Sequence, residues 1–350
     1  MKKIMYVIPT LNVGGAEKLV INLVNKINKN KFEPIILLFY NNENYLESLI
    51  EQDVKIIKLD KKIGLDLSMF KKVYNVIKEE KPDIIHAHLD TLLYLMPYLH
   101  KIKRKIFTVH NMANEEAVGL QRLVRYACFK LKLIEPIGLS PTVSESIEQL
   151  YNLKNVKYVY NGINVQQYFS SYKTNVFNII AVGTLKPQKN YEMMIEVAKK
   201  LKDNGLNYTL HILGDGTLKN DISNKIHRYN LEENIILHGA VNNVSYYLSK
   251  ADILISTSNY EGIPLSILEA LASSLPVICT DVGGNVDLIF NGENGFLIEK
   301  GNVNKMVKSI IEIYKNEDKR KEMALNAREK SKKYDISNTM VEYEKLYKEC

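Results

Sequence analysis

Cysteine is scarce in this sequence, and long apolar runs are missing from it. Cys128, Cys279 and Cys350 lie far apart with no ligand-type spacing. This argues against a disulfide framework and a zinc cluster, and it predicts unpaired thiols in a reducing compartment. The longest apolar runs fall short of the ~18 residues that a membrane-spanning helix needs. The opening residues, MKKIMYVIPT, predict a β-strand rather than a secretory leader, so we expect a cytoplasmic protein.

The 350 residues are enough for two domains, and their basic side chains are unevenly distributed. Residues 1–165 hold 24 Lys and Arg against 17 Asp and Glu, a difference of +7, whereas residues 166–350 hold 23 of each. The basic segments KIKRK (101–105) and LQRLVRYACFKLKLI (120–134) suggest a face that meets anionic lipid or a phosphorylated substrate. Solvated helix faces are the alternative. Nucleic acid is not expected, because the basic residues are not interleaved with exposed aromatic residues.

Short apolar strands alternate with amphipathic helices along the whole chain, which predicts α/β domains with parallel sheets. The expected strands are IMYVIPT, PIILLFY, VKIIKL, DIIHAH, KIFTVH and IGLSPTVS in the first half, and NIIAVG, YTLHILG, NIILHG, DILIST, PVICT and GFLI in the second. The polar, turn-prone segment 159–176 separates the two series. We therefore expect two doubly wound domains, over residues 1–168 and 169–334, followed by a C-terminal segment over 335–350.

Ligands of doubly wound folds bind at the carboxyl ends of the strands, so the residues that follow each strand are the candidate site residues. Gly14 and Gly15 open a helix after the first strand, where an anion can approach the backbone, although two glycines also suit a plain tight turn. His86 and His88 alternate on the fourth strand and should point to the same side. They form half of a metal site at most, since no matching ligand set accompanies them. His110 ends the fifth strand and is either a structural hydrogen-bonding residue or a site residue.

The second half places cations and glycine turns at similar strand ends. Lys186 and Lys189 lie in the loop after one strand, and Gly214 and Gly216 form the turn after the next. Together with the glycines of the first half, three strand–loop–helix junctions offer positive charge and helix N-termini at one edge. This combination suits a nucleotide diphosphate, because helix N-termini and lysines both stabilise phosphate charge.

Two glutamates eight positions apart surround a Gly-Ile-Pro turn in SNYEGIPLSILEALASS (258–274). The turn follows a strand-like run, and Pro264 suits the first helical position, so Glu261 should lie in the loop and Glu269 in the second turn of the helix. Both could be ordinary surface residues. However, Glu269 lies among leucines and isoleucine, where an unpaired charge is costly. Carboxylates accept hydrogen bonds from hydroxyl groups, and a sugar and a ribose both present hydroxyl groups.

These motifs, taken as a set, resemble the retaining family 4 glycosyltransferases of the GT-B fold. The family's E-x7-E motif matches Glu261 and Glu269, and further segments occur in the family's order and spacing: VGTLKPQKN, ILGDG, LHGAV and LEALASSLPVICTDVGGNVDLIFNGENGFLI. In the first half, GGAE, HAH, TVHN, TVSES and NGIN are similar to the family's counterparts. The resemblance covers essentially the whole chain. It implies two Rossmann-like domains that face a central cleft.

The resemblance also implies a role for each matching residue. Glu261 would bind hydroxyl groups of the donor sugar, Glu269 the ribose and Lys189 the diphosphate. His110 would contact the transferring sugar. The remaining implied contacts are the backbone of Gly262, Ile263, Pro264 and Leu265 with the donor, Gly15 with the leaving phosphate, Gly214 with the donor, and Gly14, His86 and His88 on the acceptor side. The last helix would cross back to the N-terminal domain.

The chain departs from the family at Thr184, where many members have an arginine that binds the diphosphate. Lys186, two residues later, is expected to reach the same oxygen, although without the bidentate geometry of arginine. Asn164 is a smaller departure, since an aspartate often follows NGI. The D-x-D motif that holds a metal in GT-A transferases does not occur in the sequence. We therefore expect transfer that needs no metal or other cofactor.

The expected function is sugar transfer with retention from a nucleotide sugar, expected to be a UDP-sugar, to a lipid-linked or surface-polysaccharide precursor. Capsule and lipopolysaccharide are examples of such products. The expected location is the cytoplasm, with peripheral binding to the inner face of the cell membrane. Two alternatives remain open: a nucleotide-sugar epimerase or hydrolase on the same fold, and a non-catalytic partner subunit of a transferase. Thr184 keeps the last of these open.

Overall fold

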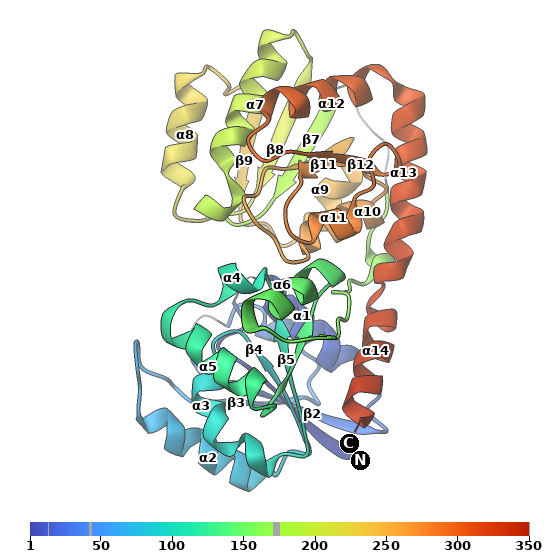
Figure 1. Ribbon diagram of the computed structural model, residues 1–350. Helices are drawn as coiled ribbons and strands as arrows, with labels where there is room; N and C mark the ends of the chain where they lie inside the picture. Colours follow the sequence, from blue (N-terminus) through green and yellow to red (C-terminus); the bar gives the residue numbers. More distant parts are fainter. Residues whose placement is uncertain (13, 42–43, 171–175, 350) are drawn as a thin grey trace. The chain divides into compact units, whose positions relative to one another are not determined.

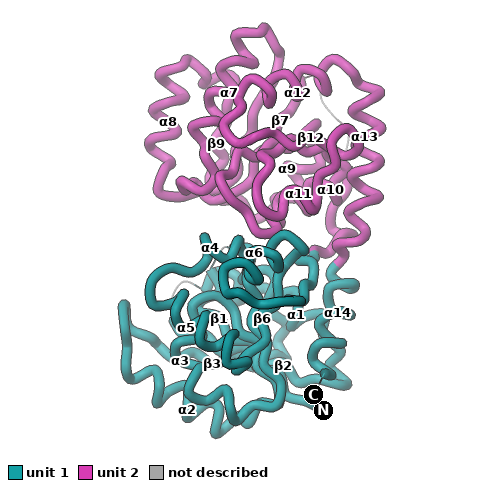
Figure 2. Tube along the Cα trace, in the orientation of Figure 1, with its two compact units in different colours: residues 1–162, 336–350 teal, residues 163–335 magenta. Residues whose placement is uncertain are grey.

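The computed structural model describes residues 1–12, 14–41, 44–170 and 176–349, and it divides into two compact units (Figure 2). The N-terminal unit consists of Met1–Gly162 and the segment that begins at Ile336, and the C-terminal unit consists of Ile163–Asp335. The chain thus passes from one unit to the other at residues 162–163, earlier than the expected position near residue 168. Each unit contains one parallel sheet with its own apolar core.

The N-terminal unit is built on a six-stranded sheet in the order β3-β2-β1-β4-β5-β6, and all neighbouring strands are parallel (Figure 1). Its strands are β1 (Lys2–Ile8), β2 (Phe32–Leu38), β3 (Lys55–Lys58), β4 (Ile84–His88), β5 (Arg104–Val109) and β6 (Glu135–Gly138). Its helices are α1 (Gly15–Lys26), η1 (Glu47–Leu49), α2 (Ser68–Glu80), α3 (Leu92–Leu95), η2 (Met96–Lys101), α4 (Ala113–Glu116), α5 (Gly119–Lys130), α6 (Pro141–Tyr151) and α14 (Ile336–Lys348).

The C-terminal unit repeats this architecture with the strand order β12-β11-β10-β7-β8-β9, again all parallel. Its strands are β7 (Phe177–Val182), β8 (Tyr208–Leu213), β9 (Ile235–Gly239), β10 (Ile253–Ser256), β11 (Val277–Thr280) and β12 (Gly295–Ile298). Its helices are η3 (Val165–Gln167), η4 (Pro187–Lys189), α7 (Tyr191–Asp203), α8 (Lys219–Arg228), α9 (Val244–Lys250), α10 (Leu265–Ala272), α11 (Asn285–Leu288), α12 (Val303–Lys315), α13 (Glu317–Ser331) and η5 (Lys332–Tyr334). The prediction of two doubly wound α/β domains is confirmed.

The strand order fixes where each unit can hold a ligand. In the C-terminal unit the chain runs outward through β7, β8 and β9 and then returns to the other side of β7 as β10. The loops that follow β7 and β10 therefore diverge at a topological switch point, where doubly wound sheets bind ligands. Lys189 lies in the first of these loops and Glu261 in the second. In the N-terminal unit the equivalent point lies between β1 and β4.

Two local expectations were wrong. The expected strand IGLSPTVS ends at Gly138, and α6 begins at Pro141, because the Ser140 hydroxyl accepts a hydrogen bond from Val143 N and caps the helix. Pro264 directly precedes α10 with ψ near 118° rather than occupying its first turn. Glu261 and Glu269 still lie in the loop and in the second turn, as expected.

The final helix, α14, belongs to the N-terminal unit. Tyr343 and Tyr347 of this helix are fully buried there, and the Tyr347 hydroxyl lies 3.1 Å from that of Tyr6 on β1. Burial therefore fastens the end of the chain to the first strand. Among the described residues, no helix is long and apolar enough to span a membrane.

Candidate active site

The strongest candidate site lies at the switch point of the C-terminal unit, where Glu261 is buried with 5% of its surface exposed. Its Oε1 atom is 2.5 Å from the Lys189 ammonium and 2.6 Å from the Ser258 hydroxyl, both of which donate to it. Gln188 Nε2 approaches the other oxygen, Oε2, at 3.5 Å. A buried carboxylate without partners would be costly, and Lys189 and Ser258 offset that cost.

The paired groups keep capacity for a ligand. An ammonium has three donors, and among the described residues Lys189 gives one of them to Glu261. Its side chain is 18% exposed, so the remaining donors can meet a phosphate oxygen. Within the described part of the chain, Glu261 Oε2 has only the long contact with Gln188, so it can accept a hydrogen bond from a hydroxyl group. One cation and one acceptor thus lie side by side, which suits a ligand that carries both phosphate and hydroxyl groups.

Backbone contacts hold the two loops of this site together. Asn259 N donates to Gln188 O at 2.7 Å, and the Thr257 hydroxyl lies 3.0 Å from both Lys189 O and Asn190 O. The Thr280 hydroxyl on β11 donates to Ser258 O at 2.6 Å. The positions of Lys189 and Glu261 therefore depend on three neighbouring strand ends rather than on one flexible loop.

Gly283, in the loop after β11, packs against the Glu261 backbone. Its φ of +49° lies in the left-handed region, and a Cβ atom there would come within 1.9 Å of Glu261 O. Only glycine fits both conditions. Gly214, after β8, is similarly confined: its φ is +144°, and a Cβ atom would lie 1.9 Å from Gly183 O in the loop after β7. Gly214 is thus packed against the loop that carries Lys189 and is not a free turn.

The start of α10 joins these side chains. Gly262, Ile263, Pro264 and Leu265 are buried in a row after Glu261. Leu265 and Ser266 begin the helix, so their N–H groups have no carbonyl one turn earlier. Such N–H groups stabilise negative charge. Glu269, one turn further on, is 3% exposed and forms a side-chain hydrogen bond with Tyr168. Burial and the negative charge of Glu269 both raise the pKa of Tyr168.

Lys186 takes a different position from Lys189. It is exposed and immediately precedes η4, with its backbone N–H donating to Thr184 O at 2.8 Å. The Lys186 ammonium is therefore accessible to a ligand from solvent. Whether it replaces the arginine missing at Thr184 stays a prediction.

In the N-terminal unit, Gly14 and Gly15 lie at the start of α1 as expected, with Gly14 in the capping position and Gly15 exposed. The three histidines also gather: the rings of His86 and His88 lie 4.1 Å apart, and His88 Nδ1 is 2.9 Å from His110 Nε2. The two β4 histidines thus share one side of the strand, as predicted. Among the described residues, no group of three His, Cys, Asp or Glu side chains could hold a metal ion.

His86 differs from its expected acceptor-side position. It is fully buried, with Nδ1 2.8 Å from the Tyr347 hydroxyl and Nε2 2.7 Å from the Thr108 hydroxyl. Both ring nitrogens are therefore engaged, and the geometry makes His86 a link between β4, β5 and α14. The residue that completes this link, Tyr347, lies 261 positions away, which is why the sequence could not reveal it.

His110 has one nitrogen to offer. Its Nε2 contacts His88, and within the described chain Nδ1 has no hydrogen-bond partner. The Glu116 carboxylate accepts hydrogen bonds from the backbone N–H groups of His110 and Asn111, and Arg125 donates to the same carboxylate at 2.7 Å. Burial, with a contribution from the Arg125 charge, lowers the pKa of His110 to about 3. A neutral ring at pH 7 can exchange hydrogen bonds with a sugar but cannot act as a cationic acid.

The three histidines predict a pH dependence of stability. Burial lowers the pKa values of His86 and His88 well below the value of about 6.5 expected in the unfolded chain. The unfolded state therefore binds more protons once the pH falls below 6.5, and the free energy of unfolding should drop by up to about 1.4 kcal/mol per pH unit for each buried ring. Thermal unfolding at pH 7 and pH 5 measures this change. The difference in melting temperature between pH 7 and pH 5 should be smaller in His88→Asn, which lacks one buried ring. It should be unchanged in His227→Asn, because His227 is exposed. Equal melting temperatures at both pH values in the wild type would contradict the prediction.

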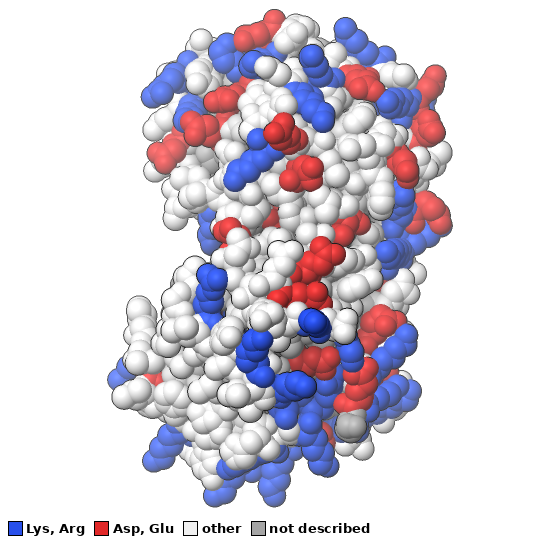
Figure 3. Space-filling model, in the orientation of Figure 1, with Lys and Arg blue, Asp and Glu red and all other residues white. Residues whose placement is uncertain are grey.

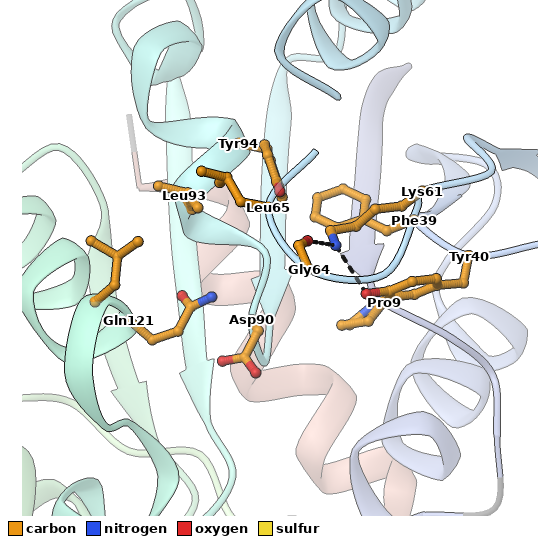
Figure 4. Close-up of a pocket in the computed structure, with 11 residues that line it drawn as sticks. Pro9, Phe39, Tyr40, Lys61, Gly64, Leu65, Asp90, Leu93, Tyr94 and Gln121 are labelled. Atoms are coloured by element: carbon orange, nitrogen blue, oxygen red, sulfur yellow. Dashed lines mark hydrogen bonds between the residues drawn. The ribbon is translucent and has the colours of Figure 1, made fainter. Parts of the chain in front are cut away.

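A cavity of about 340 Å³ lies at the carboxyl edge of the N-terminal sheet (Figure 4). Apolar and aromatic side chains line much of it, and Lys61, Asp90 and Gln121 supply its polar groups. The Lys61 ammonium donates to the Tyr40 hydroxyl at 3.0 Å and to Gly64 O at 2.5 Å. The sequence gives no signal for Lys61, Asp90 and Gln121, because no motif marks them and they come from two loops and from α5. Ser258, Gln188 and Gly283 of the C-terminal unit are likewise not predicted as site residues from the sequence. For Gly283 the two adjacent glycines after β11 are a sequence signal that could have indicated a close backbone approach.

The cysteines have the expected state where they can be seen. Cys128 and Cys279 are free and buried, and burial raises the pKa of Cys128 to about 11. Neither is therefore a reactive thiolate at neutral pH. Cys350 lies outside the described residues.

Comparison with known proteins identifies the family of this chain. The profile described as "Glycosyl transferases group 1" matches residues 167–330, and the one described as "Glycosyltransferase Family 4" matches residues 13–167. An Escherichia coli UDP-Gal:alpha-D-GlcNAc-diphosphoundecaprenol alpha-1,3-galactosyltransferase is 28% identical over 71% of this chain and 70% of its own.

One further relative and one solved structure match over nearly the full length. A Campylobacter jejuni alpha-1,4-N-acetyl-D-galactosaminyltransferase, named for an acceptor linked to PP-undecaprenol, is 27% identical over 100% of this chain and 99% of its own. Among solved structures, Anabaena HepE in complex with UDP and glucose has a TM-score of 0.84 at 19% identity, and the match covers 99% of each chain. The two profiles together span residues 13–330, and the folds agree. The chain therefore belongs to the family 4 glycosyltransferases and has the GT-B fold.

Proposed function

We propose that this glycosyltransferase moves a sugar, with retention and without a metal, from a UDP-sugar to a lipid-linked or polymeric glycan acceptor. The observation that carries the proposal is the ion pair between Lys189 at the end of η4 and the buried Glu261 ahead of α10, with Glu269 one turn after Leu265. Together they offer a cation, free helix N–H groups and two carboxylates, which match the diphosphate, sugar and ribose of a nucleotide sugar.

Each group has a distinct task in this proposal. The leaving nucleotide diphosphate gains negative charge as the sugar departs, and Lys189 and the first N–H groups of α10 stabilise that charge. Glu261 Oε2 orients the sugar by accepting a hydroxyl hydrogen bond, and Glu269 does the same for the ribose. His110 donates or accepts at Nδ1 as a neutral ring, and His88 fixes its orientation through Nε2.

The names of the relatives support one class of acceptor, a glycan linked to undecaprenol diphosphate. The Escherichia coli and Campylobacter jejuni enzymes are both named for acceptors on undecaprenol diphosphate. The cavity of the N-terminal unit, with aromatic walls and the polar groups of Asp90 and Gln121, suits a glycan, because aromatic faces pack on sugars while polar groups bind hydroxyl groups. We assign the acceptor glycan to this cavity.

A transfer assay tests the proposal. The protein is incubated in EDTA with UDP-, GDP-, ADP- and TDP-sugars, with and without undecaprenol-diphosphate-linked glycan, and both the nucleoside diphosphate and the labelled product are measured. Release that depends on acceptor, with α-linked product, supports transfer with retention. Release or epimerisation without acceptor would favour the hydrolase or epimerase alternative, and donor binding without turnover under any condition would favour a partner subunit.

A further inference from the structure

Two segments of the N-terminal unit have an inverted polarity, with apolar side chains in solvent and charged ones inside. In the loop between β3 and α2, Ile63, Leu65 and Leu67 are 99%, 63% and 71% exposed. In the same loop, Asp66 is buried. Soluble loops normally arrange these residue types the other way round.

The loop is held firmly in this arrangement. The Asp66 carboxylate accepts hydrogen bonds from Lys62 N, Ser68 N and the Ser68 hydroxyl, and the Lys61 ammonium donates to Lys62 O at 2.9 Å. These bonds lower the pKa of Asp66 to about 2, so the carboxylate stays charged and bonded. The polar groups thus form an internal framework that directs Ile63, Leu65 and Leu67 outward.

The beginning of α5 repeats the inversion. Val118, Leu120 and Leu123 are 74%, 54% and 68% exposed, while Arg125 on the same segment is 1% exposed. Arg125 is buried because it pairs with Glu116 and donates to Leu89 O at 3.3 Å. The rest of the buried face of α5 is apolar, as expected of an amphipathic helix, and consists of Val124, Cys128 and Phe129. The inversion is thus limited to Arg125 and the apolar residues at the start of the helix.

The two segments border the same cavity, so their exposed side chains form one surface. Gly64 and Leu65 line the cavity from the β3–α2 loop, and Leu120 and Gln121 line it from α5 (Figure 4). In Figure 1 this loop and α5 lie on the same flank of the N-terminal unit. We call this surface the apolar rim, defined by Ile63, Leu65, Leu67, Val118, Leu120 and Leu123.

The charges within the two segments that carry the apolar rim are almost all of one sign, and the exposed Asp90 of the cavity that they border is 3.5 Å from the Arg125 guanidinium. Segments 61–72 and 118–132 contain one acidic residue, Asp66, which is buried. They contain eight basic residues: Lys61, Lys62, Lys71, Lys72, Arg122, Arg125, Lys130 and Lys132. Figure 3 shows Lys and Arg side chains gathered along the lower edge of the N-terminal unit, beside a flank with few charges. A protein partner would need an acidic rim to match, whereas an anionic bilayer offers negative headgroups around an apolar interior.

The geometry points to the apolar rim as a membrane-docking surface, whose apolar side chains enter the headgroup region of an anionic bilayer while the surrounding lysines and arginines bind lipid phosphates. This inference deepens the proposed function, because it would place the glycan cavity at the membrane surface. It differs from a simple basic-patch account based on residues 101–105. Arg104 there is only 13% exposed and is already paired with Glu135, and the Lys101 ammonium lies 4.7 Å from the Tyr74 ring centre.

Vesicle co-sedimentation without donor or acceptor tests the inference, so its result does not depend on sugar transfer. We expect the wild-type protein to bind vesicles of phosphatidylcholine with phosphatidylglycerol, and to bind pure phosphatidylcholine at least tenfold more weakly. The triple variant Ile63→Ser, Leu67→Ser, Leu123→Ser should lose at least tenfold in partitioning to the mixed vesicles. A second triple variant carries Lys62→Gln, Arg122→Gln and Lys132→Gln. Its partitioning to the mixed vesicles should also fall at least tenfold, and the remaining binding should depend less on salt concentration.

A matched control replaces three exposed apolar residues elsewhere, Ile236→Ser, Leu325→Ser and Val341→Ser, and should bind like the wild type. Thermal unfolding of all variants confirms folding. The inference is overturned if the wild type ignores the anionic vesicles, or if the rim variant binds them as well as the control does. It is also overturned if the wild type is a dimer and the rim variant is a monomer, since the rim would then be an interface between copies of this chain.

Discussion

Replacing Glu261 by glutamine is expected to slow sugar transfer by about 10- to 150-fold. The neutral amide keeps the size of the side chain, but it loses the charge-assisted bonds with Lys189 and the donor hydroxyl. The amide still accepts neutral hydrogen bonds from both partners, so the expected net loss equals about one charge-assisted bond, about 1.5–3 kcal/mol, and about 1.4 kcal/mol corresponds to tenfold in rate. Initial rates at saturating donor measure the effect.

The matched control for this variant is Glu312→Gln. Glu312 also pairs with a lysine, Lys319, at 2.5 Å, but its side chain is 48% exposed and lies on α12. Exposed pairs contribute little, so its transfer rate should equal that of the wild type. A Glu261→Gln enzyme with the wild-type rate would remove Glu261 from the account of donor binding.

Gly283→Ala is expected to destabilise the C-terminal unit and abolish donor binding. The added Cβ would lie 1.9 Å from Glu261 O, at a backbone φ of +49° that alanine rarely adopts. Overpacking and left-handed strain together cost about 2–5 kcal/mol, which is a fall of roughly 5–15 °C in the melting temperature of a unit of this size. The loop that carries Glu261 must move to relieve the clash.

Gly292→Ala separates strain from displacement of the site. Gly292 has a φ of +82°, and a Cβ atom there would meet nothing within 4 Å. This variant should lose stability through strain alone and still bind the donor. If Gly283→Ala bound a nucleotide sugar as tightly as Gly292→Ala does, the packing of Gly283 on Glu261 would not be needed for donor binding.

Much of the architecture could be predicted because it depends on local patterns. Apolar runs with turn residues between them mark each strand, and the spacing of Glu261 and Glu269 follows from a strand, a turn and a helix that are consecutive in sequence. The prediction of a strand through Ser140 and Pro141 was wrong because it also relied on a local pattern. The four apolar and small residues before the proline continue the strand pattern, but the cap formed by Ser140 begins a helix there.

The parts that could not be predicted depend on contacts between distant segments. Nothing near His86 indicates that Tyr347 would bond it, and nothing near Arg125 indicates a buried guanidinium. Once Arg125 turns inward to Glu116, the leucines of the same helix turn outward, and the apolar rim follows. Lys189 was singled out for a phosphate, but its pairing with Glu261 appears only when the loops after β7 and β10 are brought together.

The central claim is that the C-terminal unit binds a nucleotide sugar through the carboxylates of α10 and its preceding loop. Thermal unfolding in EDTA with UDP-, GDP-, ADP- and TDP-sugars tests it, comparing wild type with Glu269→Ala and with Tyr168→Phe. The phenylalanine variant removes the hydrogen bond to Glu269 but keeps the carboxylate. A ligand at a hundred times its Kd adds about 2.7 kcal/mol to stability.

The account predicts that a UDP-sugar raises the melting temperature of the wild type and of Tyr168→Phe, and raises that of Glu269→Ala little. Stabilisation of Glu269→Ala equal to that of the wild type would contradict the assignment of the ribose to Glu269. No stabilisation of the wild type by any of the four donors would contradict the central claim.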